Sequence, residues 1–173
     1  MNLDQLFKLQ QIMENNIKRI SQIDENALGE ENVFDLRFLA LQVKVGELAN
    51  LTKCYKYSKT REDISRDKLM IRYIDAMKYL LSIGNENNFS IINIDSVNSV
   101  AKEESVIKAF GNIFDDITHL KYNIKHSNYI DAMSRYIKLL GEFLNLGSNL
   151  GLSFEEVYNY YLEMAPCSGA PRK

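Results

Sequence analysis

The chain has 173 residues, of which 46% are hydrophobic and 25% are charged, and its formal net charge at neutral pH is −2. These values are ordinary for one globular domain with a sizeable core, and the lack of a basic excess argues against nucleic acid and anionic membrane as partners. Only two prolines and eight glycines interrupt the chain, which favours helices over strands and turns. We therefore predict an all-α, single-domain helical bundle.

The first residues after Met1 form an amphipathic segment rather than a continuous apolar stretch. This segment has neither the apolar core nor the small-residue cleavage site of a signal peptide, and no apolar run reaches membrane-spanning length. Cys54 and Cys167 are too few for a disulfide framework or a cysteine-based metal site. We expect a cytoplasmic protein that does not contact a membrane and whose cysteines are plain thiols.

The N-terminal half of the sequence predicts three helices. Apolar residues recur at helical spacing over residues 3–20 and predict the first. Asp35 is a suitable N-cap for the second helix, whose apolar residues again form one stripe. A polar loop over 58–65 follows, and Ser65 caps a third helix that runs to about Ser82.

The C-terminal half predicts three more helices, which brings the total to about six. Their expected bounds are 99–122, 127–146 and 153–164. A short segment at 89–94 precedes them as a single turn or a brief extended link. Ser153 and Glu156 form a capping box at the start of the last helix. The domain therefore covers residues 1–164, and we expect the small, proline-containing tail over 165–173 to be disordered.

One short sequence occurs twice. The pentapeptide Tyr-Ile-Asp-Ala-Met stands at 73–77 and again at 129–133. Two amphipathic helices of similar pattern can share such a match by chance. Alternatively, an ancestral duplication has produced a bundle with two related helix pairs.

Four charged residues form the most informative pattern. Lys44 and Glu47 lie one helical turn apart on the second predicted helix, and Arg72 and Asp75 lie one turn apart on the third. If these helices pack antiparallel, the four side chains meet between them. We predict a buried charge cluster in which Lys44 pairs with Asp75 and Arg72 with Glu47. The alternative is that the acids are exposed and the cations extend into solvent without a partner.

Two segments carry a resemblance to a known family. The sequences FLALQVKVGELANLTKCYKYSK and RYIDAMKYLLSIGN resemble the paired motifs of the dimeric, all-α dUTPases, members of a superfamily of nucleoside triphosphate pyrophosphatases that includes MazG-like enzymes. The family motifs are Glu-x-x-Glu and Glu-x-x-Asp, whose four carboxylates bind magnesium. The resemblance implies a homodimer, Mg²⁺ as cofactor and dUTP or a related dNTP as ligand. It also implies attack of magnesium-activated water on a phosphorus, with release of pyrophosphate.

The chain departs from the family pattern where carboxylates are expected. Glu47 and Asp75 match the second carboxylate of each pair, and the resemblance gives them a catalytic, metal-binding role. Lys44 and Arg72 occupy the first position of each pair. Neither an ammonium nor a guanidinium group can ligate magnesium. A unit positive charge about 5 Å from a divalent ion also repels it by roughly 6 to 7 kcal/mol at an effective dielectric constant near 20.

Two further positions carry over as candidates for substrate binding. Gln10 matches the first-helix glutamine associated with uracil recognition in the family, although glutamine is common on amphipathic helices. Lys56 lies between two tyrosines, as in the family's aromatic-Lys-aromatic-Trp motif, but Ser58 stands in place of the tryptophan that helps to enclose the base. A simpler interpretation of Lys56 is a solvated cation at a helix C-terminus.

These features predict a dUTPase-like pyrophosphatase homologue with a degenerate magnesium site and weakened or lost hydrolysis. The alternative is a non-catalytic dimer on the same scaffold, with a nucleotide-binding, regulatory or purely structural role. A working enzyme with a reduced or relocated metal site also stays open. Because lysine and arginine attract triphosphate directly, loss of the metal does not require loss of the nucleotide.

Overall fold

The computed structural model describes residues 3–57 and 64–164, and these residues form helices without strands. The α-helices are α1 (Leu3–Ile20), α2 (Glu25–Leu28), α3 (Glu30–Thr52), α4 (Arg66–Glu86), α5 (Ile94–Asn98), α6 (Val106–Lys125), α7 (Tyr129–Asn149) and α8 (Phe154–Met164), with a 3-10 turn, η1 (Phe89–Ile91), between α4 and α5. The predicted all-α fold is confirmed. The six long helices correspond to the six predicted, and α2 and α5 are short additions. Most of the predicted loop at 58–65 and the whole predicted tail at 165–173 lie outside the described residues.

Two predicted helix starts are wrong. Asp35 does not cap the second long helix, because α3 begins at Glu30, directly after Gly29. The positive φ of Gly29, 83°, suits glycine and lets the chain turn from α2 straight into α3. The Asp35 carboxylate instead pairs with Lys121 of α6 at 2.7 Å. The helix predicted at 99–122 begins only at Val106, where the Ser105 hydroxyl caps it.

Other local predictions are confirmed. α1 has the predicted bounds. α4 follows Ser65, although the hydroxyl makes no capping hydrogen bond, and it extends past the predicted end to Glu86. At the start of α8, the Ser153 N–H donates to Glu156 Oε2 at 2.8 Å and the Glu156 N–H donates to Ser153 Oγ at 3.2 Å. This reciprocal pair is the predicted capping box.

The expectations on membrane contact and thiols are tested in part. No helix within the described ranges is long and apolar enough to cross a membrane. Cys54 is a half-buried free thiol, as predicted, and Cys167 lies outside the described residues. The cytoplasmic location stays a prediction.

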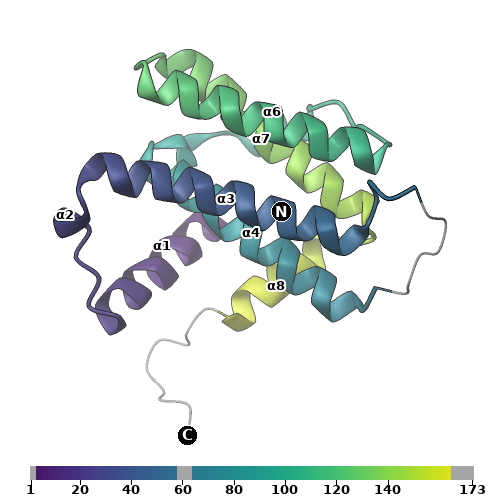
Figure 1. Ribbon diagram of the computed structural model, residues 1–173, viewed down its shortest axis with the longest axis horizontal. Coiled ribbons are helices and arrows are strands. Elements are labelled where there is room, and N and C mark those ends of the chain that lie inside the picture. Colours follow the sequence, from purple (N-terminus) through teal and green to yellow (C-terminus); the bar gives the residue numbers. More distant parts are fainter. Residues whose placement is uncertain (1–2, 58–63, 165–173) are drawn as a thin grey trace, which may run out of the picture.

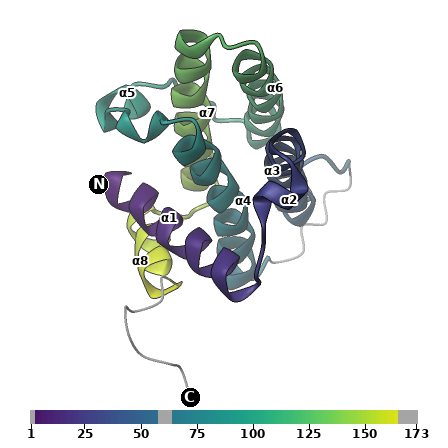
Figure 2. The same ribbon diagram turned by 90° about the vertical axis from the view of Figure 1, so that its left-hand side faces the viewer.

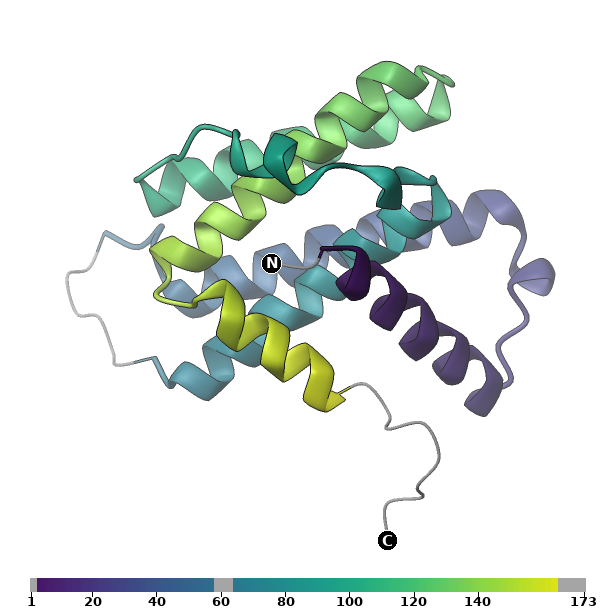
Figure 3. The same cartoon turned by 180° about the vertical axis from the view of Figure 1, so that it is seen from behind.

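Two antiparallel helix pairs, α3 with α4 and α6 with α7, form the main body of the protein. Figure 1 shows the α6–α7 pair above α3 and α4, and Figure 3 shows α1 and α8 side by side against another face of α4. In the end-on view of Figure 2, α4 lies between α1, α3 and α7. This central position explains why α4 has eleven buried residues, whereas the longer α3, with one side toward solvent, has five.

α4 and α7 cross through a reciprocal contact between tyrosine and glycine. The residues involved are Tyr73, Leu80 and Gly84 in α4, and Tyr136, Phe143 and Gly147 in α7. The Tyr73 hydroxyl donates to the Phe143 carbonyl at 3.0 Å and lies against Gly147. In the same way, the Tyr136 hydroxyl donates to the Leu80 carbonyl at 3.0 Å and lies against Gly84. The spacing in the two sets is identical, so the two helices are related by a local two-fold symmetry.

This symmetry gives a different register from the repeated pentapeptide. The contacts make Tyr73 equivalent to Tyr136, whereas the pentapeptide match aligns Tyr73 with Tyr129. In the structural register, the tripeptide Arg-Tyr-Ile occurs in both helices, at 72–74 and 135–137. The α3–α4 and α6–α7 pairs are therefore comparable units, and their common ancestry stays a prediction.

Gly84→Ala is expected to lower the free energy of unfolding by about 2 to 4 kcal/mol, through overpacking and loss of the hydrogen bond. A Cβ atom at Gly84 overlaps the Tyr136 hydroxyl and lies 2.8 Å from Phe7 Cε1, and both rings are buried. Urea denaturation measures the change. Gly46→Ala is the matched control, because no atom lies within 4 Å of its added Cβ, and alanine there should stabilise the helix by about 1 kcal/mol. Equal effects of the two substitutions would contradict the reciprocal contact.

Candidate functional site

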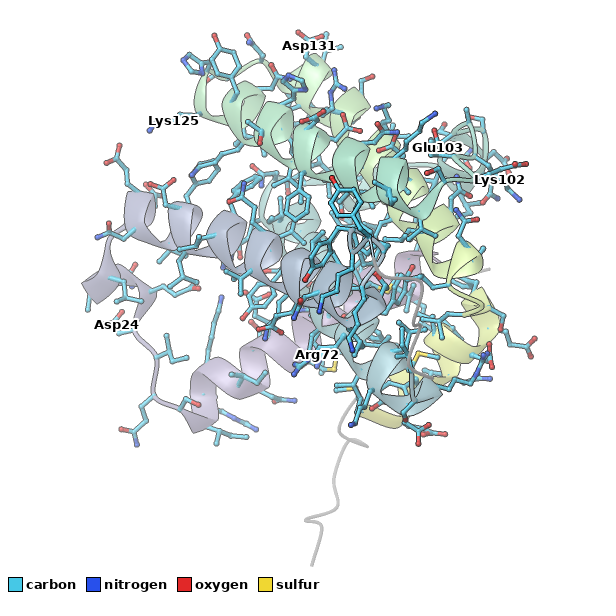
Figure 4. All side chains as sticks on the ribbon, turned by 45° about the vertical axis from the view of Figure 1, so that its right-hand side comes forward. Asp24, Arg72, Lys102, Glu103, Lys125 and Asp131 are labelled. Atoms are coloured by element: carbon cyan, nitrogen blue, oxygen red, sulfur yellow. The ribbon has the colours of Figure 1, made fainter. Side chains whose placement is uncertain are left out.

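Five charged residues of α3 and α4, called the α3–α4 cluster below, form one chain of ion pairs: Lys44, Glu47, Arg72, Asp75 and Lys78 (Arg72 is labelled in Figure 4). Lys44 Nζ lies 3.0 Å from Glu47 Oε2, and Arg72 Nη1 lies 3.3 Å from the same oxygen. Arg72 Nη1 also lies 3.6 Å from Asp75 Oδ2, and Lys78 Nζ lies 3.5 Å from Asp75 Oδ1. Arg72 therefore bridges the two acids and the two helices.

The structure brings the four predicted residues together, and the predicted Arg72–Glu47 pair is confirmed. The predicted Lys44–Asp75 pair is wrong. Lys44 pairs with Glu47 one turn along its own helix, and Asp75 pairs with Arg72 and Lys78 of its own helix. Side chains at i and i+3 reach each other without crossing between helices, which explains the local pairing. The same spacing rule identifies Lys78, which was not among the predicted residues.

The α3–α4 cluster is open to solvent. The exposed fraction of its side chains ranges from 26% for Asp75 to 45% for Arg72. The prediction of a buried cluster is therefore wrong, and so is the alternative in which Lys44 and Arg72 have no partner. Ion pairs this exposed contribute about 0 to 1 kcal/mol each to stability. Little free energy thus opposes their rearrangement around a ligand.

A second charge network, the Arg37 network, joins α3 and α4 to α1 and α2 around a cation that is more buried than those of the α3–α4 cluster. Arg37 Nη2 lies 3.1 Å from Glu14 Oε1, 3.0 Å from Glu25 Oε1 and 3.0 Å from Glu86 Oε1. Only 11% of the Arg37 side chain is exposed. Sequence reasoning missed this network because its members lie far apart in the chain and share no local spacing.

Lys18 completes the Arg37 network. Its Nζ lies 3.2 Å from Glu14 Oε1 and 2.9 Å from Glu25 Oε2. Burial opposes ionisation of Glu14, but the Ser82 hydroxyl, Lys18 and Arg37 together hold the pKa of its carboxyl below the usual value. The network thus keeps Glu14 ionised and ties the N-terminal helices to the body of the protein.

A hollow of about 740 Å³ opens beside the Arg37 network. Arg37, Glu25 and Glu86 line it together with an apolar surface that includes Phe34 and Phe38. No residue of the α3–α4 cluster lines this hollow, so it is separate from the positions that resemble the family motifs.

Gln10, the predicted base-contacting residue, is buried at the contact between α1 and α8, and its role in substrate binding stays a prediction. It is 6% exposed, and its Oε1 accepts a hydrogen bond from the Tyr161 hydroxyl of α8 at 2.6 Å. Burial raises the pKa of Tyr161, which keeps the hydroxyl protonated and able to donate. The amide oxygen of Gln10 therefore holds α8 against α1.

Lys56 lies beyond the C-terminus of α3, and its side chain is exposed. Its backbone N–H donates to the Lys53 carbonyl at 3.0 Å in the turn that ends the helix. Among the neighbouring tyrosines, the Tyr55 hydroxyl donates to Asn50 Oδ1 at 2.6 Å. Ser58, the residue at the family's tryptophan position, lies outside the described residues.

The comparison with protein families extends over nearly the whole chain. A family model described as dUTPase, for the all-α dimeric type, matches residues 2–166. The chain belongs to the all-α dUTPase family. No curated protein and no solved structure matches it.

The charge of the α3–α4 cluster bears directly on metal binding in this dUTPase-family chain. Lys44, Arg72 and Lys78 carry three positive charges and Glu47 and Asp75 carry two negative ones, so the cluster has a net charge of +1. Within the part of the chain that the structure describes, no group of three or more His, Cys, Asp or Glu residues is arranged to hold a metal ion. Magnesium requires several oxygen ligands in octahedral geometry. The cluster therefore does not fit magnesium, and its charge fits an anion.

Proposed function

We propose that this member of the dUTPase family is a pyrophosphatase homologue whose magnesium-dependent hydrolysis is weakened or lost. The observation that carries the proposal is the positive net charge of the α3–α4 cluster, where cations stand at two of the four family carboxylate positions. Glu47 and Asp75, the two remaining candidates for catalysis, each contact two cations. A divalent ion would have to break these contacts against the repulsion of three positive charges.

The ligand we propose is a nucleoside triphosphate, either dUTP or a related dNTP. The cations of the α3–α4 cluster are 27% to 45% exposed and can exchange a carboxylate for phosphate oxygens. Lysine and arginine bind phosphate through charge-assisted hydrogen bonds that need no metal. Exposed Lys56 is available for the same contact. Gln10 is only 6% exposed, and its Oε1 is engaged by Tyr161, so the proposal does not depend on a contact between Gln10 and a base.

A second candidate function is a non-catalytic homodimer with a regulatory or structural role. Leu36, Leu39 and Val43 lie at helical spacing on α3, and they are 48% to 61% exposed. Exposed apolar residues in a row are typical of a surface that a partner covers. The partner we propose is a second copy of the chain.

The test of the proposed function is release of pyrophosphate from dUTP, dCTP and dTTP, with magnesium or manganese present. We expect no release above the uncatalysed rate, and calorimetry should detect binding of a non-hydrolysable dUTP analogue in the presence of EDTA. Brisk turnover would refute the loss of hydrolysis. Binding that requires the metal would refute capture by cations, and absence of binding under both conditions would leave the homodimer, which sedimentation equilibrium detects.

A further inference from the structure

The second helix pair contains its own charge cluster, called the α6–α7 cluster below. Asp116 of α6 lies 2.6 Å from Arg135 Nη1 through Oδ1 and 2.8 Å from Lys138 Nζ through Oδ2. Lys138 Nζ also lies 3.1 Å from Glu142 Oε1. Arg135, Lys138 and Glu142 all belong to α7, so Asp116 is the group that joins the two helices.

The α6–α7 cluster corresponds to the α3–α4 cluster through the local symmetry of the fold. Arg72 and Arg135 directly precede the two reciprocal tyrosines, and each arginine reaches an acid on its antiparallel neighbour, Glu47 or Asp116. The two clusters differ in their exposure to solvent. The acid side chains of the α3–α4 cluster are 26% to 37% exposed, whereas Asp116 and Glu142 are 2% and 8% exposed.

One carboxylate oxygen of the α6–α7 cluster has no partner. Oε2 of Glu142 is fully buried and accepts no hydrogen bond within the described residues. An ionised carboxylate in this position leaves a buried charge with an unsatisfied acceptor, which is unfavourable. A protonated carboxyl group has an O–H that can donate a hydrogen bond, and the Asp116 carboxylate can accept it. Protonation therefore removes the unsatisfied acceptor.

The electrostatic surroundings favour the same state. Burial, the hydrogen bond with Asp116 and the Asp116 charge raise the pKa of Glu142 to about 7, although Lys138 opposes the shift. Burial also opposes ionisation of Asp116, but hydrogen bonds with Lys138, Glu142 and Arg135 hold the pKa of Asp116 below its usual value. These opposite directions favour the proton on Glu142 and the ionised form of Asp116 between the two cations.

Groups on α4 and on the segment that includes α5 do not change this balance. The charges that act on Glu142 are those of Asp116 on α6 and Lys138 on α7. The segment that includes α5 presents Val97 and Val100 to the adjacent Gly141. α4 meets α7 through tyrosine hydroxyls, which donate to carbonyls, and one of these carbonyls belongs to Phe143, next to Glu142.

We propose that Glu142 holds a proton against the Asp116 carboxylate in the folded protein up to about neutral pH, and that release of this proton weakens the packing of α6 on α7. The α6–α7 cluster is then a pH-sensitive contact at the core of the second helix pair. The corresponding acids of the α3–α4 cluster differ from Asp116 and Glu142 in that solvent reaches them. The inference does not depend on whether the chain hydrolyses or binds a nucleotide.

The sign of the pH dependence follows from the direction of the shift. The pKa of Glu142 is about 7 in the folded protein and has a reference value of 4.5. The folded state thus binds more protons than the unfolded state between these values, so this contribution to stability is complete below pH 4.5 and is lost as the pH rises to about 7. Glu142→Gln removes the titration but keeps a neutral side chain of the same shape.

The test compares urea denaturation of the wild type and Glu142→Gln from pH 5 to pH 8.5. As the pH rises, the unfolding constant of the wild type should increase by about tenfold or more relative to that of the variant. Glu156→Gln is the matched control: hydrogen bonds from Arg66 and Ser153 lower the pKa of Glu156 to about 2, so its ratio should stay constant over this range. A constant ratio for Glu142→Gln as well would overturn the proposal.

A direct measurement on the wild type covers the case in which the variant does not fold. Carbon-13 NMR of the side-chain carboxyl groups should show one glutamate that titrates near pH 7 and disappears from the spectrum of Glu142→Gln or of Glu142→Ala. Hydrogen exchange of α6 and α7 amides should accelerate over the same pH range, beyond the intrinsic effect of base. A Glu142 carboxyl that titrates below pH 5 would overturn the proposal.

Discussion

Arg37→Met is expected to lower the free energy of unfolding by about 2 to 4 kcal/mol, because it leaves several acids without their shared cation. The arginine side chain is 11% exposed and contacts Glu14, Glu25 and Glu86. Methionine keeps much of the apolar contact of the arginine stem, so the loss reports the charge. Lys18 then remains as the one cation of the Arg37 network, beside Glu14 and Glu25, and Glu86 loses its contact with the network. Urea denaturation at neutral pH and low salt measures the change.

Arg66→Met is the matched control for Arg37→Met. Arg66 also pairs with a glutamate, Glu156, at 2.6 Å, but the two side chains are 56% and 44% exposed. An exposed pair of this kind contributes at most about 1 kcal/mol. Equal losses for the two variants would show that enclosure of the Arg37 network adds nothing to its contribution.

The fold was predictable from sequence where the signal is local. The apolar period of α1 and the Ser153–Glu156 capping box define helices through spacing alone, and both are confirmed. Asp35 shows the limit of this reasoning. An aspartate before an apolar stripe is a good N-cap, but the positive φ of Gly29 places the start of α3 earlier, and Lys121, from a distant helix, takes up the carboxylate. Tertiary contacts decide between two local solutions that the sequence leaves equal.

For the candidate site too, the sequence predicted what depends on local spacing and not what depends on the fold. The spacing of Lys44 and Glu47, with that of Arg72 and Asp75, identified which side chains meet between α3 and α4. It did not identify the individual pairs, because a charged side chain can pair with a neighbour at i+3 on its own helix as well as with one on the facing helix. The Arg37 network and the α6–α7 cluster depend on residues brought together only by the fold.

The double variant Lys44→Glu, Arg72→Glu is expected to bind Mg²⁺, because it restores the four carboxylates of the family motifs on a scaffold that already brings these positions together. With Lys78 as the one remaining cation, the net charge of the α3–α4 cluster changes from +1 to −3. Without metal, the like charges should destabilise the double variant. Each single variant should lose about 0.5 to 1 kcal/mol, more for Arg72→Glu, since Arg72 contacts both acids.

Magnesium should reverse the loss of stability in the double variant and leave the wild type unchanged. For a weak site with a dissociation constant of about 1 mM, 10 mM Mg²⁺ stabilises the folded state by about 1.4 kcal/mol, which thermal denaturation detects. Lys44→Gln, Arg72→Gln is the control, because it removes the same cations without adding carboxylates. A wild type that gains as much from magnesium as the double variant would contradict the role given to Lys44 and Arg72. Comparison of the glutamate and glutamine double variants separates the effect of adding oxygen ligands from that of removing cations. The proposal requires that the added carboxylates, and not the loss of the cations alone, produce magnesium binding.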